Sequence, residues 1–254
     1  MVYEFSPVGI IRSCFKEKFG IPRQPGLVPQ ARATLELHAP FDSDDWTRGL
    51  EEFSHLWLIY LFHASISARQ KSTVRPPRLG GNRRLGAFAT RAPFRPNPIG
   101  LSAVRLMEVE RGAPGTLLHL EGVDILDGTP VLDLKPYVPY ADALPNAYGG
   151  YAERPPNVFN VRFDLAAETA ARDAGPDGAE DLRPLIVGLL RLDPRPAYHA
   201  LRTGGDVYGM KLCDVDVKWR VEKNGASIRV LSVEKLAPAT NPARVVKDFR
   251  ATDE

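Results

Sequence analysis

Short apolar segments separated by proline and glycine are the feature that most constrains how this chain folds. Its 254 residues include 23 Pro and 21 Gly, and both residue types interrupt helices and central strands. Over residues 1–145, runs of strand length follow one another with no long helix between them: 8–12, 33–38, 56–62, 86–90, 101–109, 116–125 and 131–135. A parallel α/β sheet would need crossover helices. The pattern therefore predicts a mainly β domain, either a barrel or a sandwich.

Two details of this first region are also predicted. The run from Leu56 to Phe62 is continuously apolar, so we expect a strand that is buried on both faces. Residues 42–49 place Ser43 and Asp44 before Trp46, which favours a capped helix of one or two turns.

The character of the sequence changes after residues 146–150, Asn-Ala-Tyr-Gly-Gly, whose composition predicts a linker. Residues 166–174 and 182–190 have helical apolar spacing, and residues 213–221 alternate like a half-buried strand. Asn224–Gly225 is typical of a type I′ hairpin that leads into a further strand. We therefore expect a small α+β domain over residues 151–236, followed by a flexible tail at 237–254.

Positive charge is concentrated in one segment. Residues 69–105 contain nine Lys and Arg and no Asp or Glu, although the net charge of the whole chain is only +2. The same segment is rich in proline and carries Phe88 and Phe94, so its guanidinium groups are displayed from a stiff loop beside aromatic rings. This combination favours RNA, which offers phosphates and unstacked bases. A solvated basic loop without a ligand is the alternative.

Several other functions lack their sequence signals. No segment has the composition of a membrane span or a secretory signal, and there is no Rossmann glycine motif, P-loop or nucleophile elbow. The five His have no ligand spacing, which argues against a metal site. Cys14 and Cys213 lie far apart with no CxxC motif, so we expect neither a disulfide framework nor a zinc ribbon. A cytoplasmic, reducing location is the simplest expectation.

A series of ordered motifs is more specific. They are Gly9–Ser13, Lys16–Phe19, Pro22–Leu27, Phe53–Trp57, Arg75–Asn82, Phe88–Arg91, Phe94–Gly100, Asp127–Pro130 and Asp133–Tyr137, with Asp193–Tyr198 and Val217–Arg220 further along. Together they resemble the TsaA-like (TrmO) tRNA methyltransferase family. The resemblance implies a compact β-barrel that binds S-adenosylmethionine near a homodimer interface. It also implies N6-methylation of N6-threonylcarbamoyladenosine at position 37, in the anticodon loop of threonine tRNA.

The resemblance further implies a set of cofactor-binding positions. They are Pro22, Arg23, Gln24, His63, Ala64, Arg91, Leu101, Glu121, Gly122, Val123 and Asp124. These residue types suit the ligand, because a methionine carboxylate needs a cation such as Arg23 or Arg91. The ammonium or the ribose hydroxyls need an acceptor such as Asp124.

Methyl transfer to this nitrogen also requires removal of its proton. The candidate catalytic residues are Asp127, Asp133 and His63. The substrate carboxylate needs a cation, and the expected substrate-binding residues are Arg75, Arg78, Arg84, Arg95, Lys135, Arg195 and Tyr198. Two other hypotheses stay open: a basic RNA-binding barrel without catalysis, and a methyltransferase of the same fold that acts on another modified RNA or a small molecule.

Overall fold

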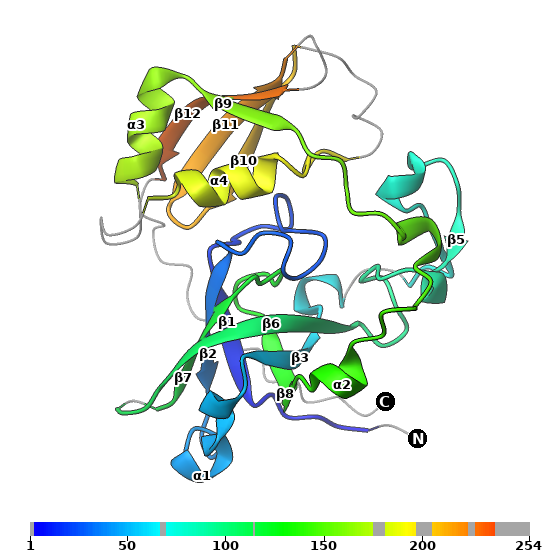
Figure 1. The fold of residues 1–254 in the computed structure, drawn as a ribbon, viewed down its shortest axis with the longest axis vertical. Helices are drawn as coiled ribbons and strands as arrows, with labels where there is room; N and C mark the ends of the chain where they lie inside the picture. The colour runs from blue at the N-terminus through cyan, green and yellow to red at the C-terminus, as the bar shows by residue number, and fades with distance from the viewer. Residues whose placement is uncertain are drawn as a thin grey trace, which may run out of the picture.

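A closed barrel of six antiparallel strands forms the first part of the chain (Figure 1). The computed structural model describes residues 3–66, 70–113, 115–174, 181–196, 205–222 and 227–236. The barrel order is β1-β2-β7-β6-β3-β8. Its strands are β1 (Gly9–Ser13), β2 (Arg32–Leu37), β3 (His55–Leu61), β6 (Ile99–Glu110), β7 (Leu117–Glu121) and β8 (Pro130–Pro136). The barrel predicted for this region is confirmed.

The interior of the barrel is filled by alternate side chains of its strands. On β3, Leu56, Leu58 and Tyr60 are buried in the core, whereas the residues between them are half-buried. The expectation that this strand is buried on both faces is therefore wrong. A barrel is a single closed layer, so its strands have only one interior face.

The segment 86–90 is not a barrel strand. Only Leu85–Gly86 is extended, as β5, and it pairs with β4 (Thr73–Val74) in a separate two-stranded ribbon. Residues 87–89 form a 3-10 turn, η4, in which Thr90 Oγ1 donates a 2.9 Å hydrogen bond to the Ala87 carbonyl. Short apolar runs of this kind carry no periodicity that separates a strand from a turn.

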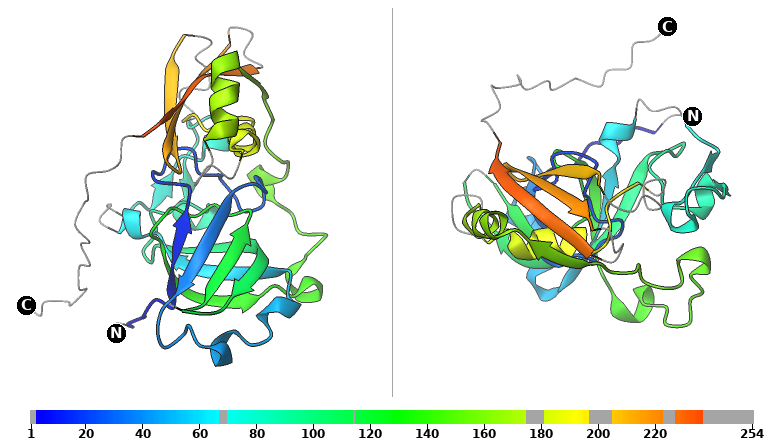
Figure 2. Two further views of the ribbon diagram at one scale, coloured as in Figure 1. Left: turned by 90° about the vertical axis from the view of Figure 1, so that its left-hand side faces the viewer. Right: turned by 90° about the horizontal axis from the view of Figure 1, so that it is seen from above.

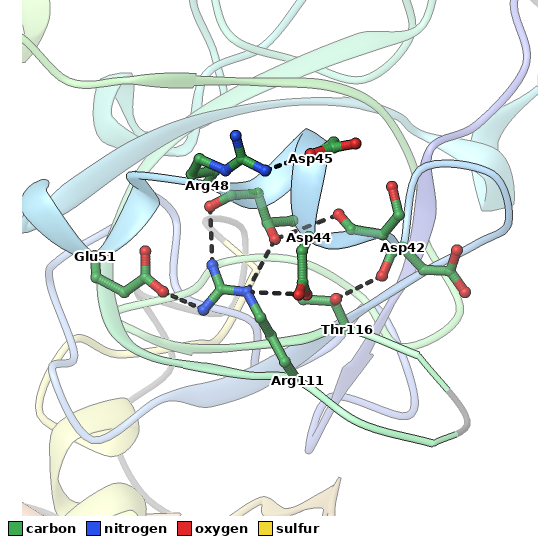
Figure 3. A network of polar contacts seen from close by, with 9 residues as sticks. Asp42, Asp44, Asp45, Arg48, Glu51, Arg111 and Thr116 are labelled. Carbon is green, nitrogen blue, oxygen red and sulfur yellow. Dashed lines mark hydrogen bonds and ion pairs between the residues drawn. The ribbon is translucent and has the colours of Figure 1, made fainter.

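The far end of the barrel is closed by a polar network around Arg111 (Figure 3). Its guanidinium donates to the Thr47 carbonyl at 3.0 Å and pairs with Glu51. These contacts fix α1 (Asp44–Thr47) and η1 (Leu50–Glu52) against the end of β6. The predicted helix is a single turn, and Ser43 makes no side-chain capping bond. The remaining short elements are η2 (His63–Ser65), η3 (Pro77–Leu79), α2 (Pro139–Asp142) and η5 (Gly150–Ala152).

The second part of the chain is a four-stranded sheet with two helices. The sheet order is β10-β11-β12-β9, and β9 pairs parallel with β12. Its elements are β9 (Asn160–Phe163), α3 (Leu165–Asp173), α4 (Arg183–Leu190), β10 (Val207–Leu212), β11 (Val215–Val221) and β12 (Ser227–Lys235). This is the predicted small α+β arrangement, although β9 and β10 were not predicted. The Asn224–Gly225 hairpin and the expected tail at 237–254 lie outside the described residues.

Buried side chains of the barrel and of the sheet belong to one continuous apolar cluster, so the boundary expected near residues 146–150 stays a prediction. Among the described residues, no helix has the length and apolar character needed to cross a membrane.

A disulfide joins the two parts. Cys14, in the loop after β1, is bonded to Cys213, in the turn between β10 and β11. The Cys213 amide also donates a 2.8 Å hydrogen bond to the Cys14 carbonyl, and Phe15 pairs with Leu212 in an isolated bridge. The expectation of unpaired cysteines is therefore wrong. The two cysteines are 199 residues apart in the sequence. Their pairing could not be predicted because only the tertiary structure brings their two loops together at the barrel–sheet junction.

Candidate functional site

Two loops meet at one rim of the barrel. The Gly26 amide, in the loop after Pro22, donates a 2.8 Å hydrogen bond to the carbonyl of Gly122, directly after β7. Gly122 has a φ of +71°, and a Cβ atom there would lie 3.2 Å from Gly26 Cα. Glycine is required at this contact by both its backbone conformation and the close approach. The segments 22–24 and 121–124, which the resemblance selects, are thus held side by side.

Asp124 is the partly buried acid of this rim. Ser102 Oγ, on β6, donates a 2.6 Å hydrogen bond to Asp124 Oδ1, and Tyr60 Oη lies 3.2 Å from the same hydroxyl. Burial raises the pKa of Asp124 from 3.8 to about 6, an effect opposed by the Ser102 hydrogen bond and by the charge of Arg91. Burial also raises the pKa of Tyr60, so that phenol stays protonated.

Arg91 and Gln24 form the cationic side of the site. The Arg91 guanidinium donates to Gln24 Oε1 and is close enough to Asp124 to lower the pKa of that carboxyl group. Arg91, Gln24 and Asp124 therefore converge from three separate segments. Leu101 does not join them, because its side chain is 55% exposed on the outside of the barrel while the neighbouring Ser102 points inward.

Arg23 lies beside the C-terminal part of the chain instead. Its guanidinium donates to the carbonyls of Asp193 and Arg195 at 3.2 and 3.1 Å. Burial lowers the pKa of Arg23. The nearby positive charge of Arg78 lowers it further, whereas the negative charge of Asp193 raises it. In this arrangement Arg23 connects the barrel rim to the segment after α4.

His63 is placed by the turn that follows β3. Its Nδ1 lies 3.2 Å from Thr129 Oγ1, and that hydroxyl donates a 2.6 Å hydrogen bond to the Leu126 carbonyl. A hydroxyl has one proton, so Nδ1 must be the donor to Thr129, and the lone pair of the neutral ring is then on Nε2. Burial lowers the pKa of His63, as does the charge of Lys18, while Asp127 opposes both.

The two other candidate acids already have partners. Asp127 accepts a 2.9 Å hydrogen bond from the Ser13 amide and pairs with Lys16 at 2.9 Å. Asp133 accepts from the Leu134 amide at 2.9 Å and pairs with Lys135 at 2.7 Å. Both carboxylates are thereby held by partners close to them in the structure.

The basic residues expected to bind substrate fall into two groups. The first group is bonded to the protein itself. Arg95 donates to the Ala87 and Thr90 carbonyls at 3.1 and 2.8 Å, and Arg78 donates to the Arg154 carbonyl. The Arg195 side chain is buried in an ion pair with Asp193. The second group, Arg75 and Arg84, is exposed and makes no ion pair with any described residue.

Two further predicted residues are not basic. Ala64 contributes its carbonyl, which accepts a 2.6 Å hydrogen bond from Lys18 Nζ. Tyr198 lies outside the described residues.

Sequence reasoning missed Ser102, Thr129 and Lys18, which contact the selected residues directly, and Tyr60, which contacts Ser102. Ser102 had one usable signal, because it is a hydroxyl at an inward position of an otherwise apolar strand face. The other three are recognisable only from tertiary contacts.

A groove of about 850 Å³ lies elsewhere, at the barrel–sheet junction. It is lined by Arg12, Ser13, Cys14, Lys16, Arg32, Ala33, Thr34, Met107, His119, Leu120, Cys213 and Asp214. Its cations are already paired, Arg12 with Glu36, Lys16 with Asp127 and Arg32 with Glu121.

The fold and the rim site define a small-β-barrel protein with a C-terminal α+β part and a polar site built from a partly buried acid, an arginine and a glutamine. Residues 10–143 match the family described as tRNA-methyltransferase O N-terminal domain, and residues 156–236 match the TrmO C-terminal domain. The chain therefore belongs to the tRNA-methyltransferase O family.

Relatives and solved structures agree with this assignment. The chain is 51% identical over 233 residues to a putative S-adenosylmethionine-dependent methyltransferase, RcsF, of Pseudomonas aeruginosa, covering 92% of this chain and 98% of that one. It is 45% identical to the tRNA (adenine(37)-N6)-methyltransferase of Escherichia coli, covering 90% and 97%. The crystal structure of TrmO from Pseudomonas aeruginosa superposes with a TM-score of 0.77 at 45% identity, covering 92% and 98% of the two chains.

Proposed function

We propose that this chain is an S-adenosylmethionine-dependent tRNA (adenine-N6)-methyltransferase that acts on adenosine 37. Its substrate is the N6-threonylcarbamoyl form of that base in the anticodon loop of threonine tRNA. The family assignment supports the reaction class, and the convergence of Arg91, Gln24 and Asp124 at one rim is the observation that carries the site. The cytoplasm, where tRNA is modified, is the proposed compartment.

The rim residues fit the cofactor by their chemistry. S-adenosylmethionine supplies an electrophilic methyl group on a sulfonium. Arg91 offers a cation for a carboxylate, and Asp124 offers an acceptor for an ammonium or a hydroxyl. Gln24 keeps Arg91 oriented through its Oε1 atom, and Ser102 orients the Asp124 carboxylate. A site held by such partners is organised before ligand binding, which reduces the entropy lost on binding.

His63 is the proposed proton acceptor. Its Nδ1–H donates to Thr129 Oγ1, which leaves the lone pair of the neutral ring on Nε2. Because burial lowers the pKa of His63, the ring is neutral and this lone pair is available at neutral pH. Asp127 and Asp133 are poorer candidates because an amide and a lysine already satisfy each of them. The proposed role of Asp127 is to hold the segment at the end of β1, through Ser13 and Lys16, and that of Asp133 is to position Lys135 on β8.

The exposed guanidiniums of Arg75 and Arg84 are proposed to contact the RNA directly. Arg95 and Arg78 are proposed to act by holding the basic loop in shape, since their guanidiniums are bonded to backbone carbonyls. Arg195 has the same kind of role after α4, because its side chain is buried against Asp193.

We further propose a homodimer. Ile99 and Leu101 are 41% and 55% exposed on the outside of β6, and they pair across the sheet with the half-buried Leu61 and Ile59 of β3. A second copy of the chain would cover this apolar surface. The surface adjoins Gly100 and Ser102, so the partner would lie next to the cofactor site.

The test uses purified chain, S-adenosylmethionine and two threonine tRNAs, one with and one without the threonylcarbamoyl group. Mass spectrometry of the digested nucleosides is expected to show a methylated threonylcarbamoyladenosine only with the modified tRNA. Methylation of unmodified adenosine 37 would contradict the proposed substrate and show that the threonylcarbamoyl group is not required. Saturable RNA binding with no methyl transfer to either tRNA would support a binding protein instead.

A further inference from the structure

Three arginines form a row across the exposed face of the C-terminal sheet. Arg220 of β11 pairs in register with Arg229 of β12, and Arg229 pairs with Arg162 of β9. Cross-strand partners point to the same face of a sheet. All three side chains are exposed, while the residues on either side of Arg220, Trp219 and Val221, are buried on the opposite face.

The opposite face is the one that packs into the core. Its side chains belong to the same apolar cluster as those of α3 and α4, which lie together on one side of the sheet (Figure 2). The arginine face is therefore left open, and adjacent strands are about 4.8 Å apart, so the row spans roughly 10 Å.

The row is only partly neutralised by the protein. Arg229 Nε pairs with Asp164 Oδ1 at 2.5 Å. Neither Arg162 nor Arg220 makes an ion pair or hydrogen bond with any residue in the described part of the chain. Elsewhere on this face Lys218 pairs with Asp216. Like charges directly opposite each other destabilise a sheet, so this arrangement favours an anion that spans the strands.

We propose that this arginine row binds the phosphate backbone of the tRNA substrate, away from the methyl-transfer site. Guanidinium groups bind phosphate oxygens in a bidentate way, and a row of them suits a repeating polyanion. A protein partner fits less well, because buried apolar anchors usually hold protein interfaces. Among the described residues of this face, only Val207, at the sheet edge, is an exposed large apolar side chain. The inference rests on the proposed tRNA substrate and gives the C-terminal sheet a role in holding it.

The test compares the full-length chain with the double variant R162Q/R220Q. A double variant of two exposed arginines on other surfaces, R48Q/R172Q, removes the same charge. Arg48 is at α1, and Arg172 is on α3. The affinity for threonine tRNA is measured over a range of salt concentrations, together with S-adenosylmethionine binding and the rate of methyl transfer at saturating tRNA.

For R162Q/R220Q we expect a roughly tenfold or greater loss of tRNA affinity and a salt slope smaller by about one to two. Cofactor affinity and the rate at saturating tRNA should be unchanged, and the melting temperature should be unchanged or higher because repulsion is relieved. The control should stay within twofold of the wild type.

Equal tRNA affinity and salt slope in R162Q/R220Q and the wild type would overturn the inference while leaving the methyltransferase function intact. Loss of affinity in R48Q/R172Q as well would also overturn it, because the effect would then reflect net charge. If the wild-type chain binds tRNA through the arginine row but never methylates it, the proposed function is wrong and the proposed binding role of the row is retained.

Discussion

Ser102 Oγ and Asp124 Oδ1 are joined by a 2.6 Å hydrogen bond between β6 and the loop after β7. The bond stabilises the ionised carboxylate, yet burial outweighs it and raises the pKa of Asp124 to about 6. The acid proposed to contact the cofactor therefore titrates close to neutral pH.

The first prediction concerns the pH dependence of stability. Because the pKa of Asp124 is higher in the folded chain than its ordinary 3.8, folding favours the protonated form. The Asp124 contribution to the free energy of unfolding should fall as pH rises from about 4 to about 6 and then level off. In D124N this contribution is absent, so at pH 8 the variant should be more stable than wild type by roughly 1–3 kcal/mol. Chemical denaturation at several pH values checks this.

The same group should control cofactor binding. The protonated acid has no negative charge and is a weaker acceptor for an ammonium or a hydroxyl, so S-adenosylmethionine affinity should weaken as pH falls below about 6. In D124N the affinity should be at least tenfold lower at pH 8 and independent of pH in this range. Calorimetric titration gives both quantities, and an unchanged affinity in D124N would remove Asp124 from the cofactor site.

The second prediction concerns Gly100. A Cβ atom at this position would lie 2.3 Å from Cε2 and Cζ of the buried Tyr60 ring, so G100A must displace the phenol that contacts Ser102. We expect a loss of about 1–3 kcal/mol in the free energy of unfolding and weaker cofactor binding. The matched control is G86A, since a Cβ there meets nothing within 4 Å and the φ of Gly86 is −58°. Equal stability of the two variants would contradict the prediction.

The sequence predicted the barrel better than it predicted the second sheet. Alternating burial on β2 follows from the period-two pattern of residues 33–38. Residues 8–12 and 101–109, which form most of β1 and β6, were predicted only as runs of strand length between turn residues. The missed strands, β9 and β10, are the two edges of their sheet. Edge strands have fewer packed neighbours, and their sequences carry weaker β signals, as Gly209 and Lys211 within β10 illustrate.

Only part of the candidate site could likewise be predicted from the sequence. The resemblance selected Gln24, Arg91 and Asp124, which the fold brings together. Ser102 and Thr129 were missed because their importance depends on which acid or imidazole lies opposite them. The Cys14–Cys213 bond was missed for the same reason, since pairing between distant loops is set by tertiary structure.

The third prediction concerns His63. The variant H63N keeps a donor near Thr129 but has no group at the Nε2 position, so single-turnover methylation should fall by about 10²–10⁴-fold while tRNA affinity is retained. Because the pKa of His63 is lowered, the wild-type rate should be level at neutral pH and decrease only below about 6.5, as the imidazole becomes protonated. T129V should cost less, about tenfold, and change the pH profile.

The controls for His63 are D127N and D133N. Each should keep the wild-type single-turnover rate, and D127N should lower stability because it weakens the contacts to the Ser13 amide and Lys16. If H63N kept the full rate while D127N or D133N lost it with binding intact, the proton acceptor would be a carboxylate.

The fourth prediction concerns the bond between Cys14 and Cys213. Both cysteines line the groove at the barrel–sheet junction, where a small thiol can reach the sulfurs. Reduction should lower the free energy of unfolding by about 2–4 kcal/mol. The variant C14S/C213S should match the reduced wild type and show no response to reductant. Equal stability of oxidised and reduced wild type would show that the bond contributes nothing measurable to the fold.

The fifth prediction concerns the proposed dimer. L101E places a charge in the middle of the apolar outer surface of β6, where Leu101 is 55% exposed. Burying that charge against a second copy without a partner is costly, so the variant should be monomeric in light scattering at concentrations where the wild type is dimeric. The control L165E changes an even more exposed leucine, on α3, and should remain dimeric. Because Leu101 adjoins Ser102, dissociation should also weaken S-adenosylmethionine binding. A wild-type monomer that binds the cofactor with full affinity would contradict both the dimer and the contribution of a partner to the site.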